Sequence, residues 1–255
     1  MNTYTSPHAR LKQQLSHQVH RSMKRIGSAI AFAFIGLNAG LGLAQTTVHL
    51  TTHELPPYSY TNAEGKAAGV AVKRVQCAFD RIKLPLQIEF LPWARAQLHA
   101  KQNLAHGFFA ASQSAERDSW AVMSATIAPQ QWRWYLRSDS PLDPKSAAFK
   151  EKATVAGFVG ANMLDWMREN GYRVEATPYT NPQLLETLLA NRVDAILANQ
   201  LVMENLLAQN PIRSPLRSVL EQDKPLSIYF SKTFLNNAPP DFLKRVNQAI
   251  TACKN

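Results

Sequence analysis

Short apolar runs alternate with longer segments of helical periodicity along most of this chain. Three runs, Val48–Thr52, Leu86–Phe90 and Gly107–Ala111, have the length and apolar character of buried strands. Between the first two runs, apolar residues recur at helical spacing from Val70 to Arg81. A second helix is expected over Trp93–Lys101, between the second run and the third. Strands that alternate with helices of this length predict parallel βαβ units.

The same rhythm restarts after the run 132–136 and its following turn. The later elements that the pattern predicts are strands at 154–158, 173–176, 195–198 and 226–230, and helices at 162–170, 181–190, 200–209 and from Pro240 to about Cys253. Two βαβ groups separated by the strand 132–136, with the strand 226–230 after the second group, predict two lobes joined by two crossing strands.

We therefore expect an α/β protein of two lobes, each a mostly parallel sheet flanked by helices, joined by two hinge strands. Residues 45–137 and 224–255 are expected to form the first lobe, and residues 138–223 the second. A ligand would bind in the cleft between the lobes, beyond the carboxyl ends of the strands.

The positive charge is concentrated at the start of the chain. The 255 residues include 28 Lys+Arg and 18 Asp+Glu, for a formal net charge of +10. Five of the basic residues and none of the acids lie within the first 44, so the remainder carries +5. This remainder contains no dense basic block, so we expect no nucleic-acid partner. Composition, with 45% hydrophobic and 18% charged residues, is that of a globular protein.

The first 44 residues have the pattern of an export signal. A basic stretch, Met23-Lys24-Arg25, precedes the apolar core 29–37 (AIAFAFIGL), and small residues end the segment at Gly42-Leu43-Ala44. A transmembrane anchor is the alternative, but glycines dilute the segment and no basic stop-transfer cluster follows. We expect cleavage after Ala44 and a periplasmic mature protein. Residues 1–22 would be an N-terminal extension, and Met23 is an alternative start.

Two cysteines, Cys77 and Cys253, exclude a disulfide-dense miniprotein and a Cys-rich zinc module. In an oxidising compartment they could form a disulfide. Two buried free thiols are the alternative, and their spacing does not decide between the two. No second His or Cys stands at metal-ligand spacing from His106, so we expect no metal and no cofactor.

Six short motifs follow one another along the chain after residue 44. They are 54–60 (ELPPYSY), 65–70 (GKAAGV), 91–95 (LPWAR), 106–109 (HGFF), 114–117 (SAER) with Ser124 seven residues later, and 193–197 (VDAIL). In this order and spacing they resemble the bacterial extracellular solute-binding proteins of family 3, periplasmic receptors that include the polar-amino-acid binders. The resemblance implies the type II periplasmic-binding-protein fold. In such folds the C-terminal helix commonly returns to the first lobe, so the resemblance favours a Cys77–Cys253 disulfide.

The resemblance implies that Arg117 binds a ligand carboxylate, because a guanidinium matches a carboxylate bidentately. An ordinary surface arginine paired with Glu116 or Asp118 is the alternative. Arg95 and Trp93 are further candidates from the LPWAR motif. On a helix their side chains diverge by about 200°, so one of them could line the cleft while the other packs.

Other candidate ligand contacts come from both expected lobes. Aromatic faces stack on apolar groups and attract cations, and a carboxylate could neutralise an amine. Free N–H groups at the start of a helix suit an anion, although Asn162 could instead simply cap that helix. These candidates are Tyr58, Tyr60, Glu54, Ser112, Gly160, Ala161 and Asn162. The aromatic residues of the strand 132–136, Trp132, Trp134 and Tyr135, are expected mainly to pack.

Asn199 is the main departure from the family pattern. Amino-acid binders of this family usually have an aspartate after the VDAIL-type strand, which pairs with the ligand α-ammonium. Asn199 can accept a hydrogen bond but carries no charge. The resemblance therefore argues less for a standard α-amino acid than for a carboxylate that lacks the amine, or for a ligand recognised by aromatic side chains.

Three functions remain open at this point. The first is a monomeric periplasmic binding protein that captures a small polar, carboxylate-bearing solute by hinge closure and delivers it to an ABC transporter permease. The second is a ligand-sensing receptor for a separate membrane signalling partner. The third is an enzyme like the cyclohexadienyl dehydratases, which needs a general acid or base. Glu54 and His106 are the cleft candidates for that role, and we expect no enzyme activity.

Overall fold

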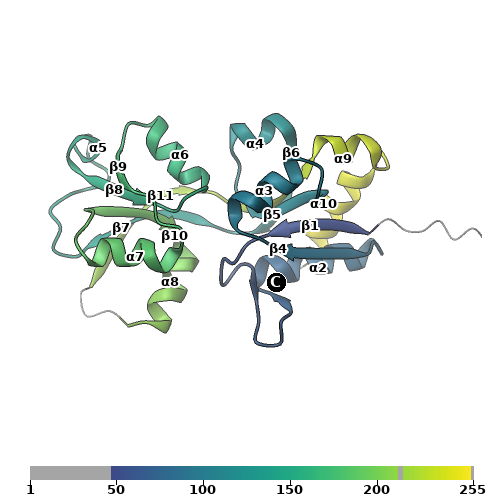
Figure 1. Ribbon diagram of the computed structural model, residues 1–255, viewed down its shortest axis with the longest axis horizontal. Helices are drawn as coiled ribbons and strands as arrows, with labels where there is room; N and C mark the ends of the chain where they lie inside the picture. The colour runs from purple at the N-terminus through teal and green to yellow at the C-terminus, as the bar shows by residue number, and fades with distance from the viewer. Residues whose placement is uncertain (1–46, 212–214, 254–255) are drawn as a thin grey trace, which may run out of the picture. The chain divides into compact units, whose positions relative to one another are not determined.

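The computed structural model describes residues 47–211 and 215–253 (Figure 1). The expected export signal and its cleavage site therefore lie outside the described residues. Within the described part of the chain, no helix is long and apolar enough to cross a membrane.

The first lobe is built on a five-stranded sheet of order β4-β1-β5-β12-β6 (Figure 1). β1 (Val48–Thr52) pairs in parallel with β4 (Leu86–Phe90) and with β5 (Gly107–Ala111). β12 (Leu226–Ser231) lies between β5 and β6 (Ala121–Ala128) and is antiparallel to both. The chain thus returns from the second lobe to fill an interior position of the first sheet.

Helices pack on this first sheet, and a short hairpin of β2 (Tyr60–Thr61) and β3 (Ala67–Ala68) stands beside them. The helices of this lobe are α2 (Val70–Arg81), α3 (Trp93–Lys101), α4 (Ala115–Trp120), α9 (Lys232–Asn237) and α10 (Phe242–Ala252). α2 and α10 pack against each other and against β6, while α3 packs against β1 and β5. Residues from both ends of the described chain therefore share one apolar core.

The start of α2 depends on Gly69, which has a φ of 116°. An added Cβ at this position would overlap the carbonyl of Tyr58, and that carbonyl accepts a hydrogen bond from the Ala71 N–H at 2.9 Å. Val72 and Val75 then carry the apolar face of the helix into the core. Glycine is therefore required both by the backbone conformation and by the close approach of the preceding loop.

The expected disulfide between Cys77 and Cys253 is confirmed. Cys77 lies on α2, and Cys253 follows α10 directly. The bond therefore ties together two helices that already pack against each other in the core of the first lobe.

The second lobe is built on a sheet of order β11-β7-β10-β8-β9. Its strands are β7 (Gln131–Arg137), β8 (Thr154–Gly157), β9 (Arg173–Ala176), β10 (Ala195–Asn199) and β11 (Leu216–Asp223). β8 is parallel to β9 and β10, whereas β7 is antiparallel to β10 and β11. The helices of this lobe are α5 (Phe149–Lys152), α6 (Asn162–Glu169), α7 (Asn181–Leu189) and α8 (Gln200–Gln209).

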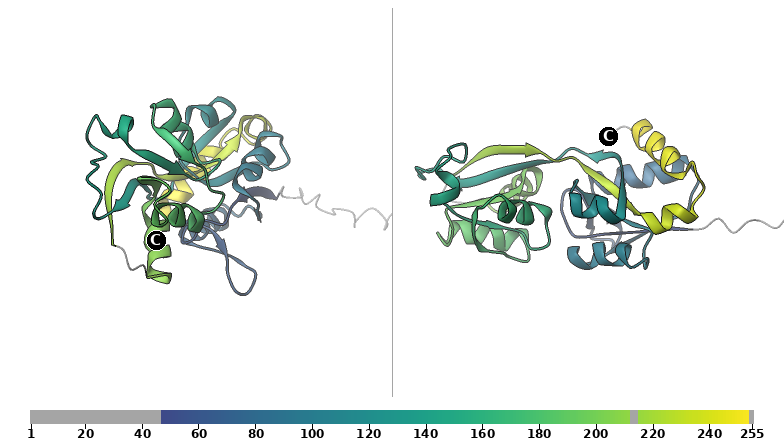
Figure 2. Two further views of the ribbon diagram at one scale, coloured as in Figure 1. Left: turned by 60° about the vertical axis from the view of Figure 1, so that its left-hand side comes forward. Right: turned by 90° about the horizontal axis from the view of Figure 1, so that it is seen from above.

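The chain crosses between the lobes twice, at Pro129-Gln130 and at Lys224-Pro225 (Figure 2). The backbone N–H of Lys224 donates to the carbonyl of Gln130 at 2.9 Å, so the two crossing segments are joined. The sequence pattern predicts the first crossing near Arg137. The structure places it earlier, because β7 pairs along its length with β10 and β11 and belongs to the second sheet.

The α/β architecture of two sheets flanked by helices is as expected from the sequence. The sheets are more mixed than the expected mostly parallel ones. Strands of the βαβ units are parallel, and the strands that lead into and out of the crossings are antiparallel to their neighbours.

Candidate ligand-binding site

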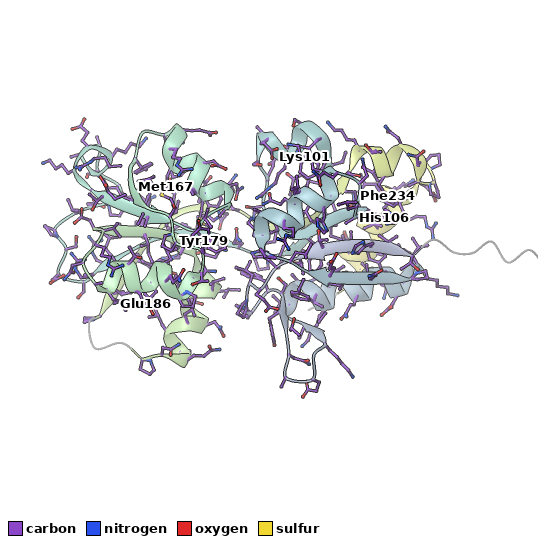
Figure 3. The ribbon with its side chains drawn as sticks, in the orientation of Figure 1. Lys101, His106, Met167, Tyr179, Glu186 and Phe234 are labelled. Carbon is purple, nitrogen blue, oxygen red and sulfur yellow. A yellow bond between two sulfur atoms is a disulfide. The ribbon has the colours of Figure 1, made fainter. Side chains whose placement is uncertain are left out.

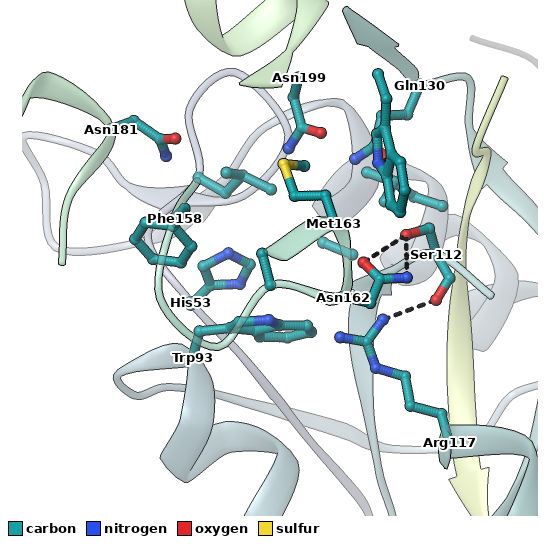
Figure 4. A pocket seen from close by; sticks show the side chains of 15 residues that line it. His53, Trp93, Ser112, Arg117, Gln130, Phe158, Asn162, Met163, Asn181 and Asn199 are labelled. Carbon is teal, nitrogen blue, oxygen red and sulfur yellow. Dashed lines mark hydrogen bonds between the residues drawn. The ribbon is translucent and has the colours of Figure 1, made fainter. Parts of the chain in front are cut away.

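A pocket lies between the lobes, beside both crossing segments and beyond the carboxyl ends of β1, β5, β8 and β10 (Figure 4). Its lining residues are His53, Leu55, Trp93, Ala110, Ser112, Arg117, Gln130, Trp132, Phe158, Ala161, Asn162, Met163, Asn181, Asn199 and Leu226. In this arrangement of the lobes the cavity among them is about 30 Å³, which is room for about one water molecule. Sites for small molecules have volumes of about 300–1,000 Å³. A small-molecule ligand would therefore need the lobes to move apart or the lining side chains to shift.

Arg117 is placed at the pocket by the first turn of α4. The hydroxyl of Ser114 caps this helix by accepting a hydrogen bond from the Arg117 N–H at 3.3 Å. The guanidinium Nε donates to Oε1 of Gln97 at 2.9 Å, and one terminal nitrogen donates to the Ser112 carbonyl at 2.7 Å. These bonds aim a rigid donor group into the pocket, in a residue that is only 3% exposed.

The positive charge of Arg117 has no acidic partner within ion-pair distance among the residues that the structure describes. Its guanidinium lies 5.2 Å from the centre of the Trp93 ring and 5.9 Å from that of Phe108. Burial lowers the pKa of Arg117 to about 10, so the group still carries its charge at neutral pH. A buried, charged and unpaired guanidinium is a ready site for a carboxylate.

Aromatic rings from both lobes form one wall of the pocket (Figure 4). Trp93, the first residue of α3, is nearly buried, and its ring centre lies 4.2 Å from that of His53. On the other side, the ring of Phe158 from the second lobe lies 6.5 Å from His53. This wall offers flat, apolar contact to a ligand.

His53, which the sequence analysis did not select, is a central residue of this pocket. It follows β1 directly and is only 6% exposed. Its Nδ1 is buried without a hydrogen-bond partner among the described residues. Burial, and secondarily the charge of Arg117, lowers the pKa of His53 to about 3, so the ring is neutral at physiological pH.

The lowered pKa of His53 predicts a loss of stability on mild acidification. The unfolded chain binds a proton below about pH 6.5, whereas the folded chain does not until about pH 3. The contribution of neutral His53 to the free energy of unfolding is therefore complete above pH 6.5 and declines as the pH falls toward 3. Between pH 7 and 5, we expect His53→Gln to lose about 2 kcal/mol less unfolding free energy than the wild type. Urea unfolding at both pH values measures this, and parallel pH profiles would contradict it.

Hydrogen bonds join the two lobes at the edge of the pocket. The Asn162 side-chain amide donates to Oγ of Ser112 at 3.1 Å and to the Gln113 carbonyl at 3.0 Å. Gln97, which also holds Arg117, donates to the Gly160 carbonyl at 3.4 Å. The residues that position the guanidinium thus also contact the second lobe.

The start of α6 differs in detail from the simple capping alternative. Ala161 occupies the N-cap position, and no side chain caps this helix. Asn162 is the first helical residue, and its side chain instead bonds across to the first lobe. Ala161 and Asn162 line the pocket, while Gly160, with a φ of 74°, lines an adjoining cavity.

Asn199 ends β10 and lines the pocket from the second lobe. The residue is 8% exposed, and its Oδ1 has no hydrogen-bond partner among the described residues. It stands at the N-cap of α8 but makes no capping bond with its side chain. Its free oxygen is therefore available to a ligand.

Four sequence candidates line neither the pocket nor the adjoining cavity. Tyr58 is fully buried, and its hydroxyl donates to the Pro129 carbonyl at 3.0 Å, which fastens the first crossing segment. Tyr60 is half-buried on β2. Glu54 is exposed and accepts hydrogen bonds from the N–H and hydroxyl of Thr61. Arg95 is exposed on α3, because a helix directs it away from the side on which Trp93 lines the pocket.

The two acid–base candidates, Glu54 and His106, are not among the pocket residues. His106 is half-buried, where its Nδ1 accepts a hydrogen bond from the His49 N–H at 3.0 Å. Its ring stacks on Phe234 with ring centres 4.4 Å apart (Figure 3). Burial, and secondarily His49, lowers its pKa. Its contacts are those of a packing residue in the first lobe.

Trp132, expected to pack, is 1% exposed and also lines the pocket. Its indole N–H donates to Oε1 of Gln130 at 3.1 Å. Other residues that line the pocket were not predicted from the sequence, namely Gln130 itself, Leu55, Ala110, Phe158, Met163, Asn181 and Leu226. His53 and Phe158 each follow a strand of a βαβ unit directly, so the rule that ligands bind beyond the carboxyl ends of parallel strands could have selected both.

A second cavity adjoins the pocket and shares Arg117, Trp132 and Asn162 with it. Its acids are exposed, and one of them, Glu116, pairs with Lys101 at 2.9 Å. Lys224 lies over the Trp132 ring at 5.1 Å, and burial, with the charge of Arg117, lowers its pKa. This cavity is therefore the charged, solvent-facing continuation of a largely neutral pocket.

Within the described residues, no group of three or more His, Cys, Asp or Glu side chains could hold a metal ion. The side chains around the pocket are chiefly aromatic rings, amides and one guanidinium. This donor set suits an organic anion.

The two-sheet fold is that of the type II periplasmic binding proteins, with a pocket between two lobes. It is similar to an arginine-bound, truncated arginine-binding protein from T. maritima, with a TM-score of 0.67 and 17% identity over 82% of this chain and 96% of that one. A histidine kinase sensor domain described as similar to periplasmic binding proteins matches with a TM-score of 0.71 and 16% identity, over 82% of this chain and 90% of that domain.

A further similar structure is an ABC uptake transporter substrate-binding protein from Streptococcus pneumoniae with bound histidine. It has a TM-score of 0.68 and 12% identity, over 81% of this chain and 86% of that one. No protein-family model matches this chain, and no curated protein matches it in sequence. The fold is therefore that of a solute-binding protein, while membership of family 3 remains a prediction.

Proposed function

We propose that this chain is an exported binding protein that captures a small carboxylate-bearing solute in the pocket between its lobes. The observation that carries this proposal is the guanidinium of Arg117, which is buried, charged and without an acidic partner among the described residues. Its hydrogen bonds to Gln97 and to the Ser112 carbonyl fix its orientation before a ligand arrives. Such preorganisation reduces the entropy that binding must overcome.

Binding would act through hinge closure. The two crossing segments, at Pro129-Gln130 and Lys224-Pro225, connect the lobes. A ligand held by Arg117 of the first lobe and by Asn162 and Asn199 of the second contacts both lobes in the closed arrangement only. A ligand with more contacts in one state shifts the population toward that state. This mechanism includes no catalytic step.

The partner that receives the closed protein is a membrane complex. Delivery to an ABC transporter permease is the first candidate, and the similar structures that bind arginine and histidine support it. Sensing is the second candidate, because a histidine kinase sensor domain has a similar fold. A permease gene beside the gene for this chain would favour delivery, and a sensor-kinase gene would favour sensing.

Thermal unfolding of the full-length purified protein, with a library of carboxylates, tests the binding function. A ligand at a hundredfold excess over Kd stabilises the folded state by about 2.7 kcal/mol, which raises the unfolding temperature of a protein of this size by roughly 5–10 °C. We expect one chemical class of carboxylates to produce such a shift. The corresponding methyl esters are the control and should produce none. A folded protein that responds to no carboxylate would contradict the proposal.

A further inference from the structure

The pocket contains one formal charge at neutral pH. Arg117 supplies it, and the other lining side chains are neutral, including His53 with its lowered pKa. No aspartate or glutamate is among the described residues that line this space. The electrostatics of the pocket therefore favour a ligand that contributes one negative charge and no positive one.

Two buried polar atoms of the pocket have no hydrogen-bond partner among the described residues. They are Nδ1 of His53 and Oδ1 of Asn199. His53 is 6% exposed and Asn199 is 8% exposed. Buried polar atoms are nearly always hydrogen-bonded in folded proteins, because an unmade bond is costly. Both side chains line the pocket, from opposite lobes (Figure 4). A ligand with uncharged polar groups would satisfy them.

The acids near Arg117 lie outside the pocket. Glu116, Asp165 and Glu169 line the adjoining cavity and are exposed to solvent. Asp118, which also acts on the charge of Arg117, accepts a hydrogen bond from the Tyr229 hydroxyl at 2.6 Å. Glu116 already pairs with Lys101. An ammonium group inside the pocket would lie among amides, aromatic rings and a cation, and would lose its hydration without gaining a carboxylate partner.

We propose that the ligand is a carboxylate whose other polar groups are uncharged, above all an α-hydroxy acid rather than an α-amino acid. This inference rests on the proposed binding function and names its ligand class. A hydroxyl has one donor and two acceptor lone pairs, so it can donate to Oδ1 of Asn199 while it accepts from His53 in the tautomer that carries the proton on Nδ1. An ammonium group can only donate, and it carries a charge that the pocket does not neutralise.

Matched ligands test the proposal directly. Each common α-amino acid is compared with the α-hydroxy acid and the unsubstituted acid that have the same side chain, using thermal shift and then calorimetry on the full-length protein. In the best-binding set, we expect the hydroxy acid to bind roughly a hundredfold more tightly than the amino acid. We also expect it to bind more tightly than the unsubstituted acid, which leaves the two polar atoms unpaired.

The outcomes of this comparison separate the ligand class from the binding function. Preference for the amino acid would overturn the ligand class and leave the binding function standing. Equal affinity for the hydroxy acid and the unsubstituted acid would also overturn the ligand class, since the two polar atoms would then have no role in selection. If the folded protein bound none of the carboxylates, the binding function itself would be overturned.

Asn199→Asp supplies the missing charge with an almost unchanged shape. It should shift the preference between hydroxy and amino acid toward the amino acid by roughly tenfold or more. Asn236→Asp is the matched control, because Asn236 is exposed on α9 and outside the pocket. Gln130→Glu places an acid elsewhere in the same pocket and serves if the first variant folds poorly. An unchanged preference in the acidic pocket variants would overturn the proposal.

Discussion

Arg117→Met is expected to weaken binding of the carboxylate ligand by roughly a hundredfold or more. The variant removes the one formal charge of the pocket, together with the donor fork that Gln97 and the Ser112 carbonyl hold in place. Isothermal titration with the best ligand from the carboxylate screen measures the effect. Arg117→Lys retains the charge without the fork, so we expect it to bind with intermediate affinity.

Arg95→Met is the matched control for this prediction. Arg95 lies two residues after Trp93 but is exposed and outside the pocket. We expect this variant to bind as the wild type does, with an unchanged unfolding temperature. Equal losses of affinity in the two variants would show that long-range charge, rather than the position of Arg117, governs binding.

Loss of the Cys77–Cys253 bond is expected to lower the free energy of unfolding by about 2–5 kcal/mol. The bond joins residues separated by 176 positions in sequence, so its removal releases a very long loop in the unfolded chain. Urea unfolding of the double Cys77→Ser, Cys253→Ser variant measures the effect, and reduction of the wild type should reproduce it. Neither cysteine lines the pocket, so ligand affinity should be unchanged at temperatures where both proteins are folded. Equal stability with and without the bond would contradict the prediction.

The helices and strands with strong periodicity could be predicted from the sequence. α2 has the predicted bounds because its apolar residues are spaced for one buried face. β11 was missed, since it lies at the edge of its sheet and is mostly half-buried, which leaves no clear alternation of apolar and polar residues. β6 was missed as well, because its interior serine and threonine interrupt the apolar run.

The site was less predictable than the fold. Arg117 and Trp93 were selected and line the pocket, but Tyr58 was selected for its place after two prolines and is buried against the Pro129 carbonyl. Sequence spacing shows which residues share a helix face, and does not show which face meets the other lobe. Gln130 lies in a crossing segment that carries no sequence motif. Its position at the pocket follows from the backbone hydrogen bond between the two crossing segments, which the sequence does not show.

The interior position of β12 sets the order in which the lobes can be completed. Residues 47–128 supply β1, β4, β5 and β6, yet β5 and β6 are not neighbours until β12 is inserted between them. The second sheet needs only strands from residues 131–223. A chain that emerges from a ribosome or a translocation pore with its N-terminus first can therefore finish the second lobe while the first still exposes two unpaired strand edges. The lobe that begins the chain is therefore the last to complete its sheet.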